Sequence, residues 1–186
     1  MKFDVVIIGG GLAGMTAATL LQKSGKACVV IARGLSLSGE DRGEFERLGG
    51  TILPGDRVIS GTVRGNRVCS VRTERLGDIA LEADDFILAT GKFFSCGLIA
   101  DMEHVYEPIF GLDVRQTPGF GDRADESFHA RQAFLDFGVI TRNGRGLLHG
   151  QPLENLFVAG EVREGLSGQA DAIRQSAEEV SRYMLE

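Results

Sequence analysis

The chain has 186 residues, 43% of them hydrophobic and 25% charged, and a formal net charge of −6 at pH 7. This composition is typical of one globular domain, and the acidic balance argues against nucleic acid as a main partner, because phosphate binding needs a basic face. The three cysteines have neither metal-ligand nor disulfide spacing, so we expect a reduced cytoplasmic setting and no metal site.

The N-terminal segment predicts a strand, a glycine-rich turn, a helix and a second strand. Residues 3–9 are rich in Val and Ile and end in glycine, as a buried parallel strand does. Residues 12–24 have helical periodicity with Gly25 as a stop, and residues 27–32 form the second strand. The apolar run in residues 5–8 is too short to span a bilayer. This βαβ unit predicts a site for the ADP half of a dinucleotide.

Each glycine of the turn Gly9-x-Gly11-x-x-Gly14 has a physical role. Gly9 permits the tight turn, Gly11 lets a pyrophosphate approach the helix N-terminus, and Gly14 allows the helix to pack closely on the strand. We therefore expect Gly9, Gly11, Leu12, Ala13 and Gly14 to bind the cofactor. The second strand should end in an acid that binds the adenosine ribose, but here it ends in Ala32 and Arg33.

The middle of the chain predicts a loop followed by a β-meander. Residues 34–43 are polar and rich in glycine, which predicts a loop or linker; residues 44–48 are predicted to be a helix end, and residues 51–53 a strand. Residues 57–64, 67–74 and 79–82 are extended segments separated by turn signals. Residues 85–90 then form a buried strand that ends in Gly91.

The last third contains one more strand and a long helix. Residues 92–130 show no regular periodicity, residues 154–159 form a buried strand, and residues 168–185 form a terminal helix. We therefore predict that residues 1–186 form a single α/β domain. It would contain a Rossmann-type parallel sheet, a crossover antiparallel β-meander and flanking helices, which is the FAD/NAD(P)-binding fold.

The distal motifs favour a flavin over a nicotinamide cofactor. Thr90 and Gly91 close a strand after the meander, and Gly160-Glu161 closes the final strand. Glu161 is placed to accept hydrogen bonds from ribitol hydroxyls, although an ordinary solvated carboxylate is the alternative. Gly168 and Gln169 open the terminal helix, whose N-terminal amides could face the flavin ring or the phosphates.

With these motifs, the chain resembles the glutathione-reductase-type flavoproteins, and more closely the B subunits of bacterial anaerobic glycerol-3-phosphate dehydrogenases. The carrying stretches are FDVVIIGGGLAGMTAATLLQKSG, GGTILPGDRV, ATGKFFSCGLIA, EPIFGLDVRQT and LENLFVAGEV. That family is roughly twice as long, with a large segment where this chain has only residues 34–47. Its usual Gly-Asp appears here as Gly160-Glu161.

Because Ala32 stands where an acid would bind the adenosine ribose, three cofactors are possible. FMN, which the resemblance implies, has no adenosine ribose. FAD could be held by backbone groups with Arg33 stacked on the adenine. NADP could pair its 2′-phosphate with Arg33. The intact glycine turn favours FAD over FMN, and NADP leaves Gly160-Glu161 unexplained.

The resemblance also implies an activity and partners. A flavin-dependent oxidoreductase of this family would oxidise glycerol 3-phosphate and pass electrons towards quinone, with partner subunits that hold it peripheral to the inner membrane. The alternatives are a flavin-binding module without turnover and a flavin reductase fed by NAD(P)H. Arg115 and Arg163 are candidates for a substrate phosphate, and Phe93 and Phe94 for an interface or substrate edge. No catalytic residue can be assigned.

Overall fold

The structure is a computed structural model that describes residues 2–34, 39–101, 104–116, 137–166 and 168–186. The elements in chain order are β1 (Lys2–Ile8), α1 (Leu12–Lys23), β2 (Cys28–Ala32), α2 (Gly39–Arg47), β3 (Thr51–Pro54), β4 (Val58–Arg64), β5 (Arg67–Thr73), β6 (Ala80–Leu88), β7 (Ile99–Ala100), β8 (Val105–Tyr106), β9 (Val114–Arg115), β10 (Gly138–Val139), β11 (Thr141–Arg142), β12 (Arg145–Leu148), β13 (Gln151–Val158), the 3₁₀ turn η2 (Gly160–Val162) and α3 (Ala170–Leu185).

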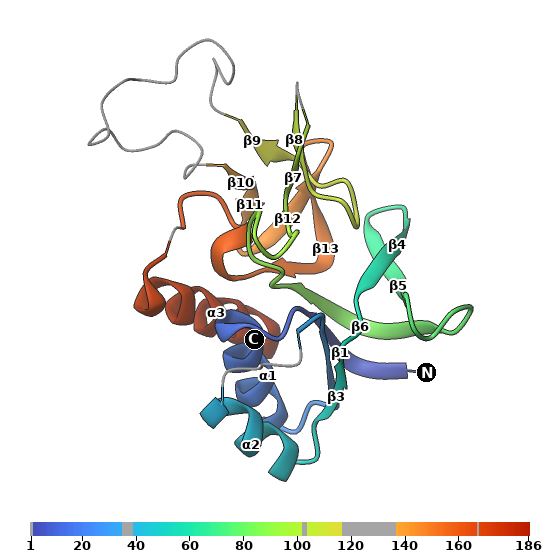
Figure 1. Cartoon of the computed structure of the whole chain (residues 1–186), viewed down its shortest axis with the longest axis vertical. Helices are drawn as coiled ribbons and strands as arrows, with labels where there is room; N and C mark the ends of the chain where they lie inside the picture. The colour runs from blue at the N-terminus through green and yellow to red at the C-terminus, as the bar shows by residue number, and fades with distance from the viewer. Residues whose placement is uncertain (1, 35–38, 102–103, 117–136, 167) are drawn as a thin grey trace.

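The main sheet has the strand order β11-β12-β13-β6-β1-β2-β3, in which β13, β6, β1, β2 and β3 are mutually parallel. Side chains alternate across it, so each central strand contributes to two cores. Val5 and Ile7 face α1 and α3, whereas Val6 and Ile8 face the opposite core. Figure 1 shows the three helices gathered on one side of the central strands and β7 to β12 on the other. The α/β fold with a Rossmann-type parallel sheet is confirmed.

The first βαβ unit agrees with the prediction. β1 and β2 pair in parallel from Val5↔Cys28 to Ile8↔Ile31. The helix α1 between them packs its buried side chains against both strands. Its last turn ends at Ser24 and Gly25, whose φ of 90° gives the left-handed stop that glycine allows.

The prediction of two separate segments at residues 79–82 and 85–90 is wrong, because β6 runs through both. One edge of β6 pairs with β1, and the other edge pairs first with β5 and then with β13. The acidic pair Asp84-Asp85 interrupts the hydrophobic run without ending the strand. Asp84 forms an ion pair with Lys2 at 3.2 Å, and burial raises the pKa of Asp85 above its ordinary value.

The prediction of a loop over residues 34–43 is wrong from Gly39, where α2 begins. Tertiary packing decides this segment, because Phe45 is completely buried and its ring lies where a side chain at Gly50 would stand. Lys23 of α1 also pairs with Glu44 at 3.0 Å. Residues 35–38 of the predicted loop lie outside the described residues.

Two further differences concern the last third of the chain. The short strands β7 to β12 were not predicted, and residues 102–103 and 117–130 of the aperiodic stretch lie outside the described residues. α3 begins at Ala170 instead of Gly168, because Gly168 has a φ of 66° and cannot continue a right-handed helix. Among the described residues, no helix has the length and hydrophobicity that crossing a membrane requires.

Candidate flavin site

The strands β1, β2, β6 and β13 end at one edge of the sheet, and backbone hydrogen bonds connect the residues that follow neighbouring strands. Gly9 donates its N–H to the carbonyl of Ile31 at 2.9 Å, and Ala89 donates to the carbonyl of Ile8 at 2.8 Å. Parallel sheets bind ligands outside these carboxyl ends. The glycine turn and the Thr90-Gly91 turn therefore lie next to each other at the edge where a ligand is expected.

The three glycines of the first turn stand in different surroundings. A Cβ at Gly9 would lie 2.2 Å from the carbonyl oxygen of Ala89, and the φ of Gly9 is 113°. A Cβ at Gly14 would lie 1.9 Å from the carbonyl oxygen of Gly9. A Cβ at Gly11 would meet no atom within 4 Å. Gly9 and Gly14 are therefore required by the fold, whereas Gly11 leaves open space at the start of α1.

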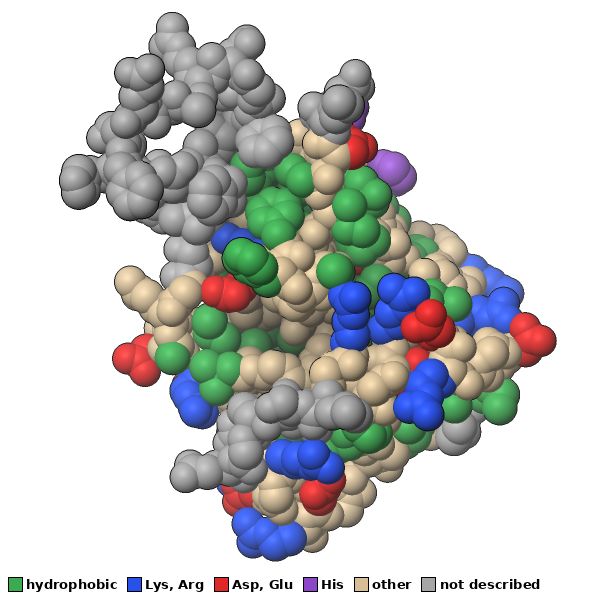
Figure 2. All heavy atoms as spheres, in the orientation of Figure 1, with side chains coloured by type: hydrophobic (Ala, Val, Ile, Leu, Met, Phe, Trp, Pro, Cys, Tyr) green, Lys and Arg blue, Asp and Glu red, His purple; other side chains and the backbone are tan. Residues whose placement is uncertain are grey.

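A cavity of about 960 Å³ opens at this edge of the sheet, at the upper end of the range for ligand sites. Figure 2 shows the hollow near the middle of this face, with a largely uncharged floor, hydrophobic side chains above it and Lys or Arg side chains beside it. Its walls come from the glycine turn, the ends of β2 and β3, the start of β4, the segment after β6 and the loop after β8. The lining residues used below are Gly9, Gly11, Leu12, Ala13, Ala32, Arg33, Asp56, Arg57, Ile59, Thr90, Gly91, Phe94, Cys96, Pro108, Ile109, Gly160 and Glu161.

Ten of the thirteen residues predicted to bind the cofactor line this cavity: Gly9, Gly11, Leu12, Ala13, Ala32, Arg33, Thr90, Gly91, Gly160 and Glu161. The other three lie beside it. Gly14 is buried under the glycine turn, and Gly168 and Gln169 are exposed ahead of α3. The assignment of all thirteen residues to the cofactor stays a prediction.

Glu161 has a partner inside the protein. One of its carboxylate oxygens, Oε1, accepts the backbone N–H of Gly168 at 2.7 Å. The loop that leads into α3 is thereby attached to the end of β13. The assignment of Glu161 to ribitol hydroxyls stays a prediction, and so does the alternative of an ordinary solvated carboxylate.

The edge beyond Ala32 is formed by residues for which the sequence pattern predicts no role. Asp56 follows β3 and donates its N–H to the carbonyl of Ala32 at 3.2 Å. The Asp56 carboxylate is buried, and its Oδ1 accepts the backbone N–H groups of Arg57 and Arg75 at 2.8 and 3.0 Å. The Arg57 guanidinium forms two hydrogen bonds to Glu74, at 2.9 and 3.0 Å. Parallel pairing of β2 with β3 could have predicted that this edge adjoins the cofactor site.

The wall opposite the glycine turn is held by Glu107, which was also missed. Glu107 is 1% exposed, and its carboxylate accepts backbone N–H groups from Ile109, Phe110 and Leu112 at 2.8, 2.8 and 3.4 Å. This bonding fixes the loop that presents Pro108 and Ile109 to the cavity. The sequence signal that could have identified Glu107 is that it is a single acid in an otherwise apolar motif, EPIFGL.

The two phenylalanines proposed for an interface have different environments. Phe93 packs edge-on against Phe137, with ring centroids 6.3 Å apart, at the border of the core. Phe94 is fully exposed and lines the cavity. Arg163 and Arg115, the candidates for a substrate phosphate, form ion pairs with Glu179 and Glu164 at 2.9 and 2.6 Å.

The cavity suits a flavin dinucleotide in two respects. Thr90 Oγ1 is buried and makes no hydrogen bond with the residues that the structure describes, so a ligand hydroxyl or phosphate could complete its bonding. The start of α1 offers backbone N–H groups to a pyrophosphate, with space above Gly11. Gly9, Gly11, Thr90 and Glu161 are the residues that would hold the cofactor.

The thiols should differ sharply in reactivity. Cys96 is exposed at the cavity, whereas Cys28 is buried, and burial, followed by the Asp4 carboxylate, raises the pKa of Cys28 to about 12. We expect Cys96 to react rapidly with a chromogenic disulfide at neutral pH, and Cys28 to react only as the protein unfolds. Because Cys69 is partly exposed as well, the comparison is made in a Cys69→Ser background, where a Cys96→Ser substitution that keeps the fast phase would contradict this assignment.

Comparison with known proteins adds family relationships to this geometry. Residues 40–174 match a family described as an FAD binding domain, and residues 2–46 match a second FAD binding domain family. The anaerobic glycerol-3-phosphate dehydrogenase B subunit of Yersinia enterocolitica is 43% identical over 133 residues, which are 71% of this chain and 31% of that protein. The same subunit of Actinobacillus succinogenes is 40% identical over 67% of this chain and 30% of that protein. The chain thus spans about a third of the length of these curated relatives.

Solved structures agree with the fold. The chain is similar to an oxidoreductase from Agrobacterium tumefaciens with a TM-score of 0.65 and 12% identity, covering 98% of this chain and 97% of that one. It is similar to a Lactococcus lactis thioredoxin reductase with a TM-score of 0.63 and 14% identity, covering 99% and 98%. At this identity the likeness establishes the fold alone.

Proposed function

Because the chain belongs to the family of FAD-binding domains, we propose that residues 1–186 form a single domain that binds FAD and belongs to a flavin-dependent oxidoreductase. The observation that carries this proposal is the cavity at the carboxyl ends of the parallel strands, where the glycine turn, Thr90-Gly91 and Gly160-Glu161 meet. FMN is the alternative cofactor, since Ala32 offers no ribose acid.

The residues of this chain would bind and orient the cofactor. The glycine turn and the start of α1 suit its pyrophosphate, and Glu161, which lies at the end of β13 and accepts the N–H of Gly168 at Oε1, would accept hydrogen bonds from the ribitol hydroxyls. Glu107 keeps the apolar wall of Pro108 and Ile109 in place. A bound flavin would supply two-electron oxidation chemistry. No described residue is assigned as a general base.

The relatives suggest the substrate. They are named as subunits of an anaerobic glycerol-3-phosphate dehydrogenase, so we propose that the domain takes part in oxidising glycerol 3-phosphate to dihydroxyacetone phosphate alongside partner subunits. On this proposal it works in the cytoplasm, peripheral to the inner membrane through those partners. A specific observation favours the rival, a flavin module without turnover: Arg115 and Arg163 already have carboxylate partners.

One experiment tests both levels of the proposal. We expect the purified protein to be yellow, to release FAD on heating, and to lose its visible absorbance under anaerobic conditions when glycerol 3-phosphate is added. Bleaching by NADH or NADPH instead would indicate a flavin reductase, and bound flavin that no donor reduces would indicate a binding module. A colourless protein that takes up neither FAD nor FMN would contradict the cofactor assignment.

A further inference from the structure

A buried carboxylate beside the cavity has one oxygen without a partner. Asp56 is 4% exposed and lines the cavity. Its Oδ1 accepts the backbone N–H groups of Arg57 and Arg75, whereas its Oδ2 makes no hydrogen bond or ion pair within the described part of the chain. The protein also does not enclose Oδ2 completely, in contrast to the unpartnered oxygen of Thr90. Because buried carboxylate oxygens are normally hydrogen-bonded, Oδ2 calls for a ligand that donates a hydrogen bond.

Asp56 stands next to the position where the acid for the adenosine ribose is expected. The strand β3 pairs in parallel with β2 as far as Ala32↔Pro54, and Gly55, with a φ of 67°, turns the chain after it. Asp56 then donates its backbone N–H to the carbonyl of Ala32 at 3.2 Å. Neighbouring strands lie about 5 Å apart. The carboxylate that is missing from the end of β2 is therefore present one strand away.

The cavity is lined by two acids among the described residues, and these lie on opposite sides of the glycine turn. Asp56 follows β3, and Glu161 follows β13. The strand order β13-β6-β1-β2-β3 places the turn that follows β1 midway between them. Four strand spacings separate β13 from β3, which is roughly 19 Å. A dinucleotide that extends along this edge, with its pyrophosphate at the glycine turn, would meet Glu161 on the ribitol side and Asp56 on the ribose side.

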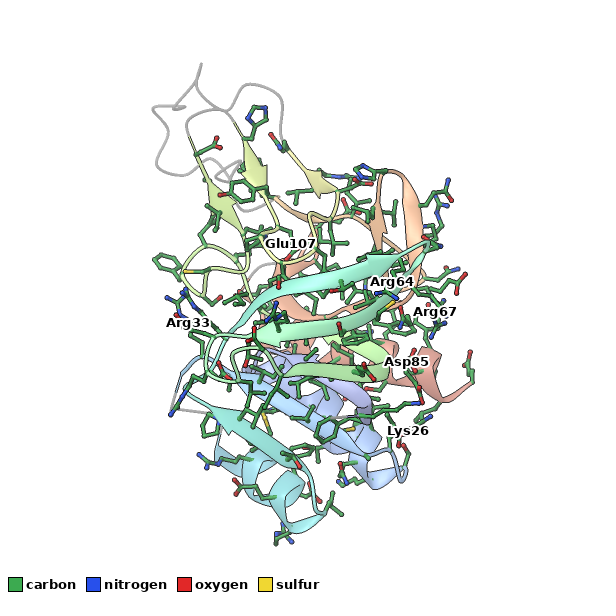
Figure 3. The ribbon with its side chains drawn as sticks, turned by 90° about the vertical axis from the view of Figure 1, so that its right-hand side faces the viewer. Lys26, Arg33, Arg64, Arg67, Asp85 and Glu107 are labelled. Carbon is green, nitrogen blue, oxygen red and sulfur yellow. The ribbon has the colours of Figure 1, made fainter. Side chains whose placement is uncertain are left out.

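The other buried or half-buried acids are not placed for this contact. Both oxygens of Glu107 accept backbone N–H groups from the loop that follows it. Asp85 lies within β6, before the strand ends. In Figure 3, Asp85 lies towards the right-hand side of the molecule, whereas Arg33, the residue after β2, lies at its left-hand rim. Asp56 is thus the acid that the fold brings to the end of β2.

We propose that Asp56 takes the place of the ribose acid that β2 lacks, with its Oδ2 accepting a hydrogen bond from a hydroxyl group of the adenosine ribose of FAD. This inference rests on the proposed function, since it names a contact to the same cofactor. The two backbone N–H groups bound to Oδ1 hold the carboxylate in place before the ligand arrives, which lowers the entropic cost of binding. Asp56 thereby favours FAD over FMN, which has no adenosine.

The test compares ligands that differ by one hydroxyl group, on the full chain freed of its cofactor. Dissociation constants for ADP, 2′-deoxy-ADP and 3′-deoxy-ADP are measured by calorimetry, because ADP is the adenosine half of FAD. Losing a hydrogen bond to a charged group weakens binding by about 10- to 100-fold. We expect the wild type to bind at least one of the deoxy nucleotides more weakly than ADP by a factor in this range.

Asp56→Asn removes the accepting oxygen with little change of shape. An asparagine keeps Oδ1 for the N–H groups of Arg57 and Arg75 and replaces only Oδ2. In this variant ADP and both deoxy nucleotides should bind equally well, and FAD should bind more weakly than to the wild type while FMN is unaffected.

Asp113→Asn is the matched control. Asp113 also accepts two backbone N–H groups, those of His149 and Gly150, but it is not among the residues that line the cavity. This variant should discriminate between ADP and the deoxy nucleotides as the wild type does.

The outcomes separate the ribose contact from the proposed function. A wild type that binds ADP and both deoxy nucleotides equally overturns the contact, and this result needs no variant to fold. Discrimination that persists in Asp56→Asn overturns it too, because another group would then contact the ribose. A wild type that binds FMN but neither FAD nor ADP overturns the contact and leaves flavin binding intact. A wild type that binds neither flavin removes the proposed function itself.

Discussion

Gly14→Ala is expected to lower the free energy of unfolding by about 3 kcal/mol. The added methyl group would lie 1.9 Å from the carbonyl oxygen of Gly9, which belongs to the rigid turn between β1 and α1. The helix would have to move off the strand to accommodate it. Denaturant unfolding followed by circular dichroism measures this loss.

Gly11→Ala is the matched control, with the opposite expected result. Its φ of −75° suits alanine and nothing lies within 4 Å, so stability should stay within about 0.5 kcal/mol of the wild type. The methyl group would occupy the space at the start of α1, and FAD should bind about tenfold or more weakly. Wild-type affinity in Gly11→Ala would show that the turn does not receive the pyrophosphate.

Glu107→Ala is expected to lower the free energy of unfolding by about as much as Gly14→Ala, because buried backbone donors would lose their acceptor. Three backbone N–H groups, those of Ile109, Phe110 and Leu112, would lose their acceptor in a buried loop. Each buried donor left unpaired costs about 1–3 kcal/mol, so a total of about 3 kcal/mol or more is expected. The exposed Glu178→Ala on α3 is the control and should be nearly neutral.

The contribution of Glu107 to the free energy of unfolding should change with pH in a definite direction. Burial raises the pKa of Glu107 and outweighs the backbone donors that lower it. A carboxyl with a raised pKa in the folded state stabilises the fold at low pH and loses that contribution as the pH rises through the raised pKa. The stability of the wild type relative to Glu107→Gln should therefore fall from the ordinary carboxyl range upwards and then level off. A difference that grows with pH would contradict this sign.

The parts of the fold that sequence predicts well are those in which local pattern and tertiary structure agree. β1, α1 and β2 were placed within about two residues, because a buried parallel strand is a continuous apolar run and the glycines mark the turn. In β6 the pattern failed, because Asp84 and Asp85 interrupt the apolar run while Lys2 neutralises one of them. In α2 it failed because Phe45, a single buried ring, fixes a helix in a glycine-rich polar segment.

The sequence predicts those site residues that belong to a recognisable motif. It does not predict the residues that reach the cavity only because two particular strands are neighbours. Gly9, Gly11, Thr90 and Gly160 belong to recognisable turns at strand ends. Asp56, Ile59 and Pro108 reach the same cavity only through the pairing of β2 with β3 and through the loop that Glu107 braces. Nothing in the local sequence around these residues states which strands will be adjacent.

The crossover from β2 to β3 has a consequence for how this architecture changes in length. Within the described residues, β3 is the last strand of its sheet and pairs only with β2, and α2 lies in the connection between these two strands. Its two ends are fixed side by side by the register Ala32↔Pro54, whatever lies between them. The entropy of closing a longer excursion grows only with the logarithm of its length. This edge of the sheet is thus a place where whole modules can be gained or lost while the cofactor cavity keeps its shape.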